Sequence, residues 1–163
     1  MPINIPDGLP AKKTLQEERI FALEEEVAEH QEIRPLRLAI LNLMPKKIQT
    51  ETQILRLISK SPIQVTCDFM RISSHESKNT AADHLVTFYS TFDDFKDKNY
   101  DGLIVTGAPI EDLKYEDVDY WDEFCRIVDW SQEHVFSTMY LCWGALAGLY
   151  YLHDIPKKML GAK

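Results

Sequence analysis

The sequence predicts an α/β protein with a doubly wound, mostly parallel sheet of the flavodoxin-like kind. Short apolar runs alternate four times with segments of helical periodicity. Two of these runs, LRLAILN at 36–42 and GLIVT at 102–106, are almost continuously apolar, which is typical of strands buried on both faces of a parallel sheet. Right-handed crossovers between such strands wind the sheet in both directions and leave helices on its two faces.

The four apolar runs give the expected strands, and the segments between them give the expected helices. In 118–133, for example, Trp121, Phe124 and Val128 recur at helical spacing. The last helix starts after Cys142 and ends before Pro156. The expected strands are 36–42, 63–70, 102–106 and 136–142, and the other expected helices are 49–60, 80–91 and 118–133.

The first 35 residues carry a different pattern. Thr14 and Glu17 have the spacing of a capping box and predict a helix that runs through Leu23 and Val27. The acidic run at 24–26 is then a solvated helix face. We therefore divide the chain into an N-terminal segment, 1–35, that covers a sheet edge or a partner, and the N-terminal part of an α/β domain, 36–163.

Composition and charge exclude several classes of function. The 163 residues carry a formal charge of -8, and no stretch concentrates lysine and arginine, so we expect no nucleic-acid or membrane partner. No apolar run is long enough to span a bilayer, and the N-terminus lacks the apolar core of a signal peptide. We expect a cytoplasmic protein.

The cysteines and histidines show no metal-binding or disulfide pattern. Three cysteines, at 67, 125 and 142, are widely spaced without a CxxC pair, and no histidine stands near another ligand at a metal-binding spacing. We expect no metal. We place Cys67 in a strand and Cys125 on the core face of a helix, where both serve packing. His30, His75, His84 and His134 are expected in surface helices or loops.

The segment YLCWGALAG predicts a nucleophile elbow at Cys142, on a sharp turn between a buried strand and a helix. The free amide groups and the dipole at a helix N-terminus favour a thiolate there. The backbone N–H of Trp143 would face an oxyanion formed at Cys142. Gly144 and Gly148 permit the tight turn, whereas His153 lies about 16 Å further along the helix and cannot be the base.

Three motifs should meet at one edge of the sheet, because each follows the carboxyl end of a strand: 42–45, 106–109 and 142–144. In the loop TGAPIEDL, Gly107 and Pro109 shape a turn that can lay an amide beside the nucleophile. Glu111 then brings a carboxylate to the rim of the pocket. Alternatively, Glu111 simply begins a solvated acidic stretch.

These residues make the sequence similar to a known family. QEIRPLRLAILNLMPKKIQTETQILRLIS, YDGLIVTGAPIE, EDVDYWDEF and STMYLCWGALAGLYY closely resemble the homoserine O-acyltransferase family of methionine biosynthesis. That family comprises homoserine O-acetyltransferases and O-succinyltransferases and is related to class I glutamine amidotransferases. The resemblance extends from about Pro2 to Pro156. NLMP-K, TGAP and CW-A-AGL in this order are highly specific.

The resemblance implies a ping-pong reaction with no bound cofactor. Cys142 would attack the thioester of acetyl-CoA, the co-substrate, and the hydroxyl of L-homoserine would then take the acyl group. In the family, a glutamate at the position of Glu111 goes with acetyl rather than succinyl transfer, and a lysine at the position of Lys163 holds the amino-acid substrate. Leu146 departs from the family, which has glutamine there. We also expect a homo-oligomer.

The resemblance further implies that the family chain continues well beyond Lys163, with a histidine and a glutamate that complete the catalytic set. We therefore expect a truncated chain that acquires an acetyl group on Cys142 slowly and does not turn over. Several alternatives remain open: serine O-acetyl transfer, homoserine O-succinyl transfer, thiol hydrolysis of the amidotransferase kind, and a non-catalytic remnant that binds a ligand or a partner chain.

Overall fold

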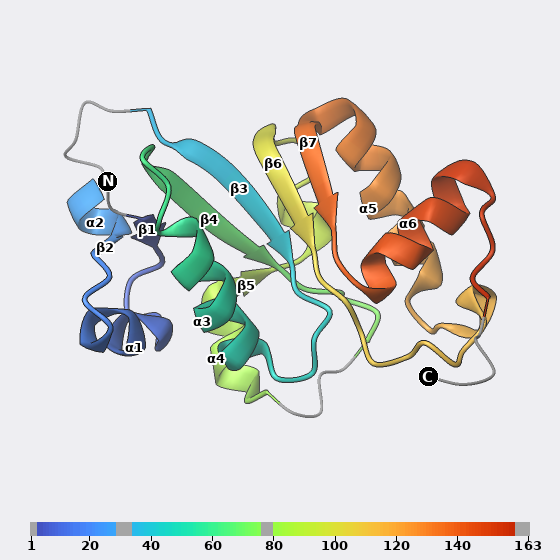
Figure 1. The fold of residues 1–163 in the computed structure, drawn as a ribbon, viewed down its shortest axis with the longest axis horizontal. Helices are drawn as coiled ribbons and strands as arrows, with labels where there is room; N and C mark the ends of the chain where they lie inside the picture. Colours follow the sequence, from blue (N-terminus) through green and yellow to red (C-terminus); the bar gives the residue numbers. More distant parts are fainter. Residues whose placement is uncertain (1–2, 29–33, 76–79, 159–163) are drawn as a thin grey trace.

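The computed structural model describes residues 3–28, 34–75 and 80–158 and confirms the predicted α/β fold. A seven-stranded parallel sheet has the order β2-β1-β4-β3-β6-β7, with β5 beside the second half of β4 (Figure 1). The strands are β1 (Ile3–Ile5), β2 (Ala22–Glu24), β3 (Leu36–Leu41), β4 (Val65–Met70), β5 (Tyr89–Ser90), β6 (Tyr100–Val105) and β7 (Val135–Tyr140).

Helices connect the strands, as the alternating pattern predicts. The helices are α1 (Ala11–Glu17), α2 (Glu25–Ala28), α3 (Lys47–Ile58), α4 (Ala82–Phe88), α5 (Trp121–His134) and α6 (Trp143–His153), with 3-10 turns η1 (Phe92–Asp94) and η2 (Tyr115–Asp117). The four central strands follow the flavodoxin-like order, in which the second strand lies on one side of the first and the third and fourth lie on the other. The strand order therefore reverses between β3 and β6, whose carboxyl ends are the expected place for a ligand.

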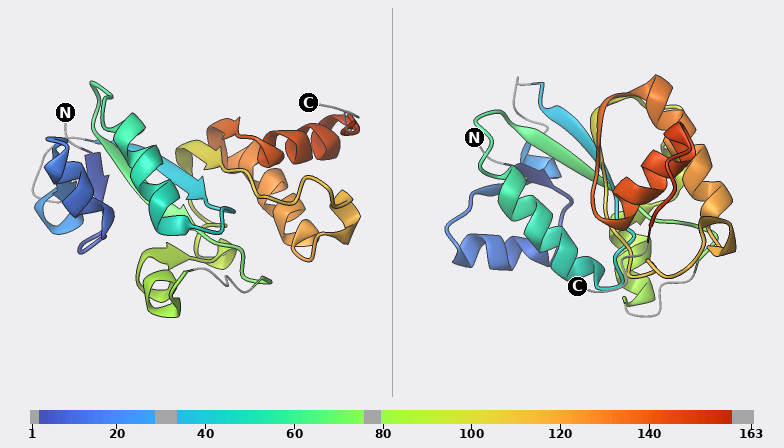
Figure 2. Two further views of the ribbon diagram at one scale, coloured as in Figure 1. Left: turned by 60° about the horizontal axis from the view of Figure 1, so that its bottom comes forward. Right: turned by 45° about the vertical axis from the view of Figure 1, so that its right-hand side comes forward.

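The sheet separates two apolar cores because successive residues of a strand point to opposite faces. Leu41 of β3 packs in the core that includes Phe124 of α5 and Trp143 of α6. Its neighbour Ile40 packs in the other core, with Leu55 of α3 and the N-terminal segment. Figure 2 shows this N-terminal segment at one end of the molecule and α5 and α6 at the other.

The N-terminal segment differs from the prediction. The helix α1 begins at Ala11, after Pro10 at its N-cap, and ends at Glu17, shortly before Arg19 adopts a left-handed φ of 60°. The predicted continuation through Leu23 is wrong, since β2 occupies that stretch and pairs with β1. Glu24 is no solvated helix residue either: its carboxylate accepts hydrogen bonds from the amide of Gly8 and from Lys12.

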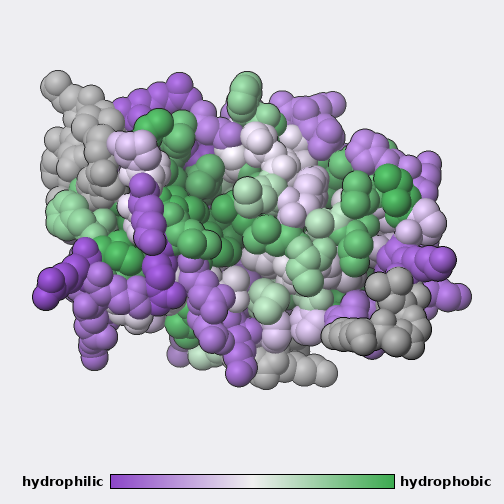
Figure 3. All heavy atoms as spheres, viewed as in Figure 1, coloured by the Kyte–Doolittle hydropathy of each residue, from purple (hydrophilic) through white to green (hydrophobic). Residues whose placement is uncertain are grey.

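The strand that leads to Cys142 lies at an edge of the sheet, so the prediction of a buried strand there is wrong. Residues of β7 face outward, with Phe136 93% and Met139 58% exposed. Apolar surface extends across the middle of the molecule in Figure 3. Leu146 and Leu149 of α6 add further exposed apolar side chains. None of the described helices is long and apolar enough to cross a membrane.

An unpaired, apolar edge strand is a template for association. We predict that the chain associates through β7, and that Phe136→Lys raises the fraction of monomer because a charge blocks edge pairing. Static light scattering over a concentration series measures this. Leu57→Lys, which changes an apolar side chain on α3 that is also largely exposed, is the matched control. A monodisperse monomer, or the same gain of monomer in both variants, would contradict the assignment.

Candidate active site

The three motifs after the strands meet at one edge of the sheet, as predicted. The amide of Thr106 donates to the carbonyl oxygen of Leu41 at 3.0 Å, and the amide of Leu141 donates to that of Val105 at 2.9 Å. The Thr106 hydroxyl oxygen accepts a hydrogen bond from the Leu43 amide at 2.8 Å. The carboxyl ends of β3, β6 and β7 are thereby held together, and the loops that follow them form one site.

Cys142 lies on the turn between β7 and α6, where an elbow was predicted. Its φ of 51° and ψ of -122° are unusual for a residue with a side chain, and its side chain is exposed. Backbone strain of this kind costs about 1–3 kcal/mol and persists where the surrounding structure enforces it. The turn presents Cys142 to solvent at the N-terminus of an eleven-residue helix.

Two glycines allow the elbow to pack against the end of β6. A Cβ on Gly144 would lie 2.7 Å from the carbonyl oxygen of Thr106. A Cβ on Gly107 would lie 2.8 Å from Cβ and 3.2 Å from Sγ of Cys142. The loop at Gly107 therefore packs directly against Cys142, as the turn in TGAPIEDL predicts.

Trp143 holds the start of α6 in place. Its indole is buried and meets the rings of Tyr115, Tyr120 and Phe124 at centroid distances of 6.2, 6.0 and 5.5 Å. As the first residue of the helix, Trp143 has a backbone N–H without an intrahelical acceptor. This is the group predicted to serve as oxyanion donor, and that role remains a prediction.

The other two cysteines are poorer nucleophiles. Cys67 lies in β4, completely buried, and burial raises the pKa of its thiol far above the ordinary value. Cys125 is half-buried on α5, where burial and then the nearby Asp129 and Asp122 charges raise its pKa to about 11. Both placements agree with the packing roles predicted from the sequence.

A cavity of about 820 Å³ opens at the carboxyl ends of β3, β4 and β6. Its wall includes the loop 42–45, the segment 71–75 and the loop 108–110, but neither Cys142 nor Glu111. Glu111 follows the lining residue Ile110 and is exposed. Its backbone carbonyl, with that of Leu113, accepts hydrogen bonds from Lys157 Nζ, which fixes this loop to the segment after α6.

The remaining predicted residues have mixed outcomes. Lys163 and His30 lie outside the described residues. His75 is exposed, and its Nδ1 lies 2.6 Å from Asp119 Oδ2 at the wall of the cavity. His84 is buried, so its predicted surface position is wrong. In the described part of the chain, no group of three or more histidine, cysteine or acidic side chains could hold a metal ion.

His84 belongs to a buried polar network that sequence patterns did not indicate. Its Nε2 lies 2.9 Å from Glu51 Oε1, which also accepts a hydrogen bond from the Tyr89 hydroxyl at 2.6 Å. The Tyr89 oxygen in turn accepts from Asn42 Nδ2 at 2.8 Å. The network connects α4 and α3 to the carboxyl end of β3, and so fixes the loop that leads to Lys47 at the start of α3.

Two cations at the cavity wall, Lys47 and Arg71, are also absent from the site residues predicted from the sequence. Lys47 is buried, and its ammonium donates to the carbonyl oxygen of Asn42. Burial lowers the pKa of Lys47 to about 8, Glu51 opposes that change, and the Arg71 charge adds to it. Arg71 directly follows β4 and lines the same cavity. The signal in the sequence is that Arg71 directly follows a predicted strand and Lys47 lies in the connection after another.

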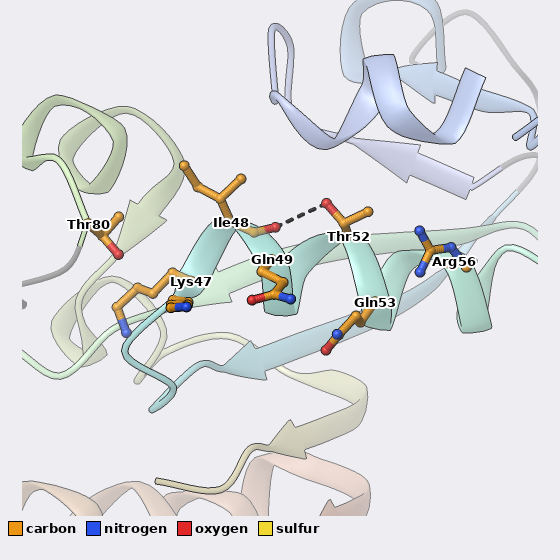
Figure 4. A pocket seen from close by; sticks show the side chains of 8 residues that line it. Lys47, Ile48, Gln49, Thr52, Gln53, Arg56 and Thr80 are labelled. Atoms are coloured by element: carbon orange, nitrogen blue, oxygen red, sulfur yellow. Dashed lines mark hydrogen bonds between the residues drawn. The ribbon is translucent and has the colours of Figure 1, made fainter. Parts of the chain in front are cut away.

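Lys47 also borders a second, shallower hollow of about 460 Å³ along α3 (Figure 4). Thr80 and Lys47 line both hollows, so the two adjoin at the start of α3. Figure 4 shows Gln49, Gln53 and Arg56 along the helix beyond Lys47. The cavity therefore continues onto a polar, cationic surface.

Glu123 anchors the segment that carries Arg71 and His75. Its carboxylate lies buried on α5 and accepts hydrogen bonds from the amides and hydroxyls of Ser73 and Ser74, at 2.7–3.0 Å. Burial opposes ionisation of Glu123, but the four donors outweigh it and hold the pKa of this carboxyl below its ordinary value. One wall of the cavity thus depends on a carboxylate from a helix 50 residues away.

Comparisons with known proteins show what the chain is similar to. The family model described as homoserine O-succinyltransferase matches residues 2–163. A homoserine O-acetyltransferase of Bifidobacterium adolescentis is 64% identical over the whole chain, which covers 47% of that relative. Proteins of the same name from Methanomassiliicoccus intestinalis and Clostridium acetobutylicum are 57% and 58% identical over the whole chain, which covers 53% and 54% of them. The chain spans about half the length of these relatives.

We predict that iodoacetamide labels Cys142 first near neutral pH, Cys125 later and Cys67 last. Alkylation requires an accessible thiolate, and burial raises the pKa of the latter two thiols. Peptide mapping over time measures the three rates. Gly107→Ala should slow labelling of Cys142 and leave the rate of Cys125 unchanged, because the added Cβ crowds Sγ. Earlier labelling of Cys125 or Cys67 would contradict the elbow assignment.

We predict that Glu123→Gln lowers the free energy of unfolding by about 1–3 kcal/mol at neutral pH, because a buried hydrogen-bond network loses its charged acceptor. The folded-state pKa of Glu123 is lowered, so the ionised carboxylate stabilises the fold fully above the ordinary carboxyl pKa. That stabilisation is lost as the pH falls through the lowered value.

Urea unfolding as a function of pH measures the difference between the two proteins, which should shrink in acid. Asp122→Asn, an exposed neighbour on the same helical turn, is the control and should change stability little. A pH-independent difference would show that Glu123 acts through packing and not through its charge.

Proposed function

Because this chain belongs to the homoserine O-succinyltransferase family, we propose that it carries the acyl-accepting cysteine of a homoserine O-acetyltransferase in L-methionine biosynthesis. The observation that carries this proposal is the exposed Cys142 on a strained turn at a helix N-terminus, in contact with the loop at Gly107. The sequence identity to relatives named homoserine O-acetyltransferase supports the same reaction.

The first half of the reaction transfers the acetyl group to sulfur. The Cys142 thiolate attacks the carbonyl carbon of acetyl-CoA, and the carbonyl oxygen becomes an oxyanion. The C–S bond to coenzyme A then breaks, which leaves an acetyl-cysteine and the CoA thiolate. The amide of Trp143 would donate to the oxyanion, and contact of the Gly107 loop with Cys142 supports a second donor from that loop.

The second half transfers the acetyl group to the acceptor. The hydroxyl oxygen of L-homoserine attacks the acetyl-cysteine, its proton passes to a base, and the thiolate leaves. Among the described residues, no histidine or carboxylate forms a hydrogen bond with Cys142. We place the base outside these residues, and we assign Lys163 to binding of the amino-acid substrate. L-Serine is an alternative acceptor, since one methylene changes binding by only about 1–3 kcal/mol.

Acetyl-CoA is the proposed donor, with succinyl-CoA as the alternative. Glu111 is exposed on the loop beside the lining residue Ile110, where its charge would oppose the free carboxylate of a succinyl group. The relatives cited above are named acetyltransferases, although the family model carries the succinyltransferase name. We further propose a cytoplasmic homo-oligomer that needs no bound cofactor.

Incubation of the chain with acetyl-CoA, followed by mass spectrometry of its peptides, tests the first half-reaction. We predict a single acetyl group on Cys142, formed faster than a succinyl group is formed from succinyl-CoA. Glu111→Gly should raise the rate with succinyl-CoA relative to acetyl-CoA, because it removes the opposing charge. Cys142→Ser should acquire no thioester with either donor.

Glu116→Gly, a change of the same kind at an exposed glutamate further along the chain, is the matched control and should leave the ratio of the two rates unchanged. Acetylation at Cys125 or Cys67 would refute the nucleophile. If Glu111→Gly does not change the ratio of the rates with succinyl-CoA and acetyl-CoA, Glu111 does not determine the acyl donor. That result would not affect the assignment of Cys142 as the nucleophile.

A further inference from the structure

The large cavity has a cationic wall that the chemistry at Cys142 does not use. Arg71 directly follows β4, Lys47 begins α3 after the neighbouring strand β3, and both residues line the cavity. The backbone amide of Arg71 is fixed by a hydrogen bond of 3.0 Å to the carbonyl oxygen of Ser90. The two like charges are close enough for Arg71 to lower the pKa of Lys47, after the larger effect of burial.

Arg71 forms no ion pair with an acid in the described part of the chain, although its charge is close enough to Asp94 to help lower the pKa of that carboxyl. The Nε of Arg71 is buried without a hydrogen-bond acceptor among the described residues. A buried N–H group that lacks an acceptor costs about 1–3 kcal/mol. Arg71 also lines the cavity, so an acceptor that enters the cavity can approach its guanidinium group.

The nearby acids have other partners or face solvent. Asp94 accepts from the amide of Thr91 at 2.9 Å, and Glu51 accepts from Tyr89. Asp119 pairs with His75, and Asp117 is exposed at the opposite wall. Glu51 and Asp94 therefore act on the two cations through their charges, but in the described residues neither acid accepts a hydrogen bond from them. Arg71 and Lys47 thus keep side-chain donors for a ligand.

We propose that Arg71, with Lys47 beside it, is the oxyanion-binding subsite of this cavity, and that it takes a carboxylate or phosphate group of a ligand. The guanidinium fork matches two oxygens of either group, and Lys47 adds a point charge from the start of α3. Where the proposed function holds, the oxyanion is either a phosphate of acetyl-CoA or the carboxylate of L-homoserine.

Inorganic phosphate is the first probe, because its binding does not depend on the proposed function. Isothermal titration of the chain with phosphate should show binding that Arg71→Gln weakens about 10- to 100-fold, the range for loss of a charge-assisted hydrogen bond. The side-chain Nε–H resonance of Arg71 should shift on titration. Arg71→Lys keeps the charge without the fork and should lose less. Arg126→Gln, at an exposed arginine on α5, is the control and should bind like the parent.

Titration with acetyl-CoA and with L-homoserine then identifies the source of the oxyanion. Weaker acetyl-CoA binding in Arg71→Gln, with unchanged binding of acetyl-pantetheine, assigns the subsite to phosphate. Weaker homoserine binding, with unchanged binding of L-homoserinol, assigns it to carboxylate. If phosphate binding depends on Arg71 and neither substrate binds the parent, the subsite stands and the proposed function fails. Equal phosphate affinity in Arg71→Gln and the parent, at equal thermal midpoints, overturns the proposal.

Discussion

The end of β6 packs against the start of α6 at a distance that leaves no room for a Cβ, and the geometry of the site depends on this contact. A Cβ added to Gly144 would lie 2.7 Å from the carbonyl oxygen of Thr106, and one added to Gly107 would lie 2.8 Å from the Cβ of Cys142. The strained φ of Cys142 is maintained because β7 is hydrogen-bonded to β6 before it and the buried Trp143 anchors the helix after it. The loop after β6 packs against Cys142 at Gly107 and lines the cavity from Ala108 onward. One loop therefore positions both Cys142 and the cavity wall.

The sequence predicts strands that are buried on both faces and helices that bury one apolar stripe. The strands β3 and β6 can be predicted from their own residues, because a parallel strand buried on both faces reads as a nearly continuous apolar run. The elbow at Cys142 is also local, since β7 ends two residues before Cys142 and α6 begins directly after it, with Gly144 in its first turn. By contrast, β1 and β2 have three residues each, too few to show a period. Whether β7 lies inside the sheet or at its edge depends on strand order, which its own residues do not encode.

Buried polar residues escape sequence reasoning for a different reason. Glu51 and Glu123 lie on helices in which charged positions predict a solvated face. Their partners come from distant segments: Tyr89 for Glu51, and Ser73 and Ser74 for Glu123. A carboxylate can be buried only when such donors converge on it, and no local pattern reports that convergence. These residues fix the loops around the cavity, so the least predictable part of the fold is the part that shapes the ligand site.

The acidic character of the chain and the cationic wall of its cavity are compatible because they act over different distances. At physiological ionic strength the Debye length is about 8 Å, so exposed carboxylates on the far surface contribute little potential at the cavity. A buried ammonium and a half-buried guanidinium are screened much less, and their attraction for an oxyanion grows as water is excluded. Net charge therefore argues against extended polyanions such as nucleic acid, while local burial decides whether a small anionic substrate binds. In this chain acids such as Asp122 and Asp129 are exposed on the outside of α5, whereas Arg71 and Lys47 line the cavity at the carboxyl side of the sheet.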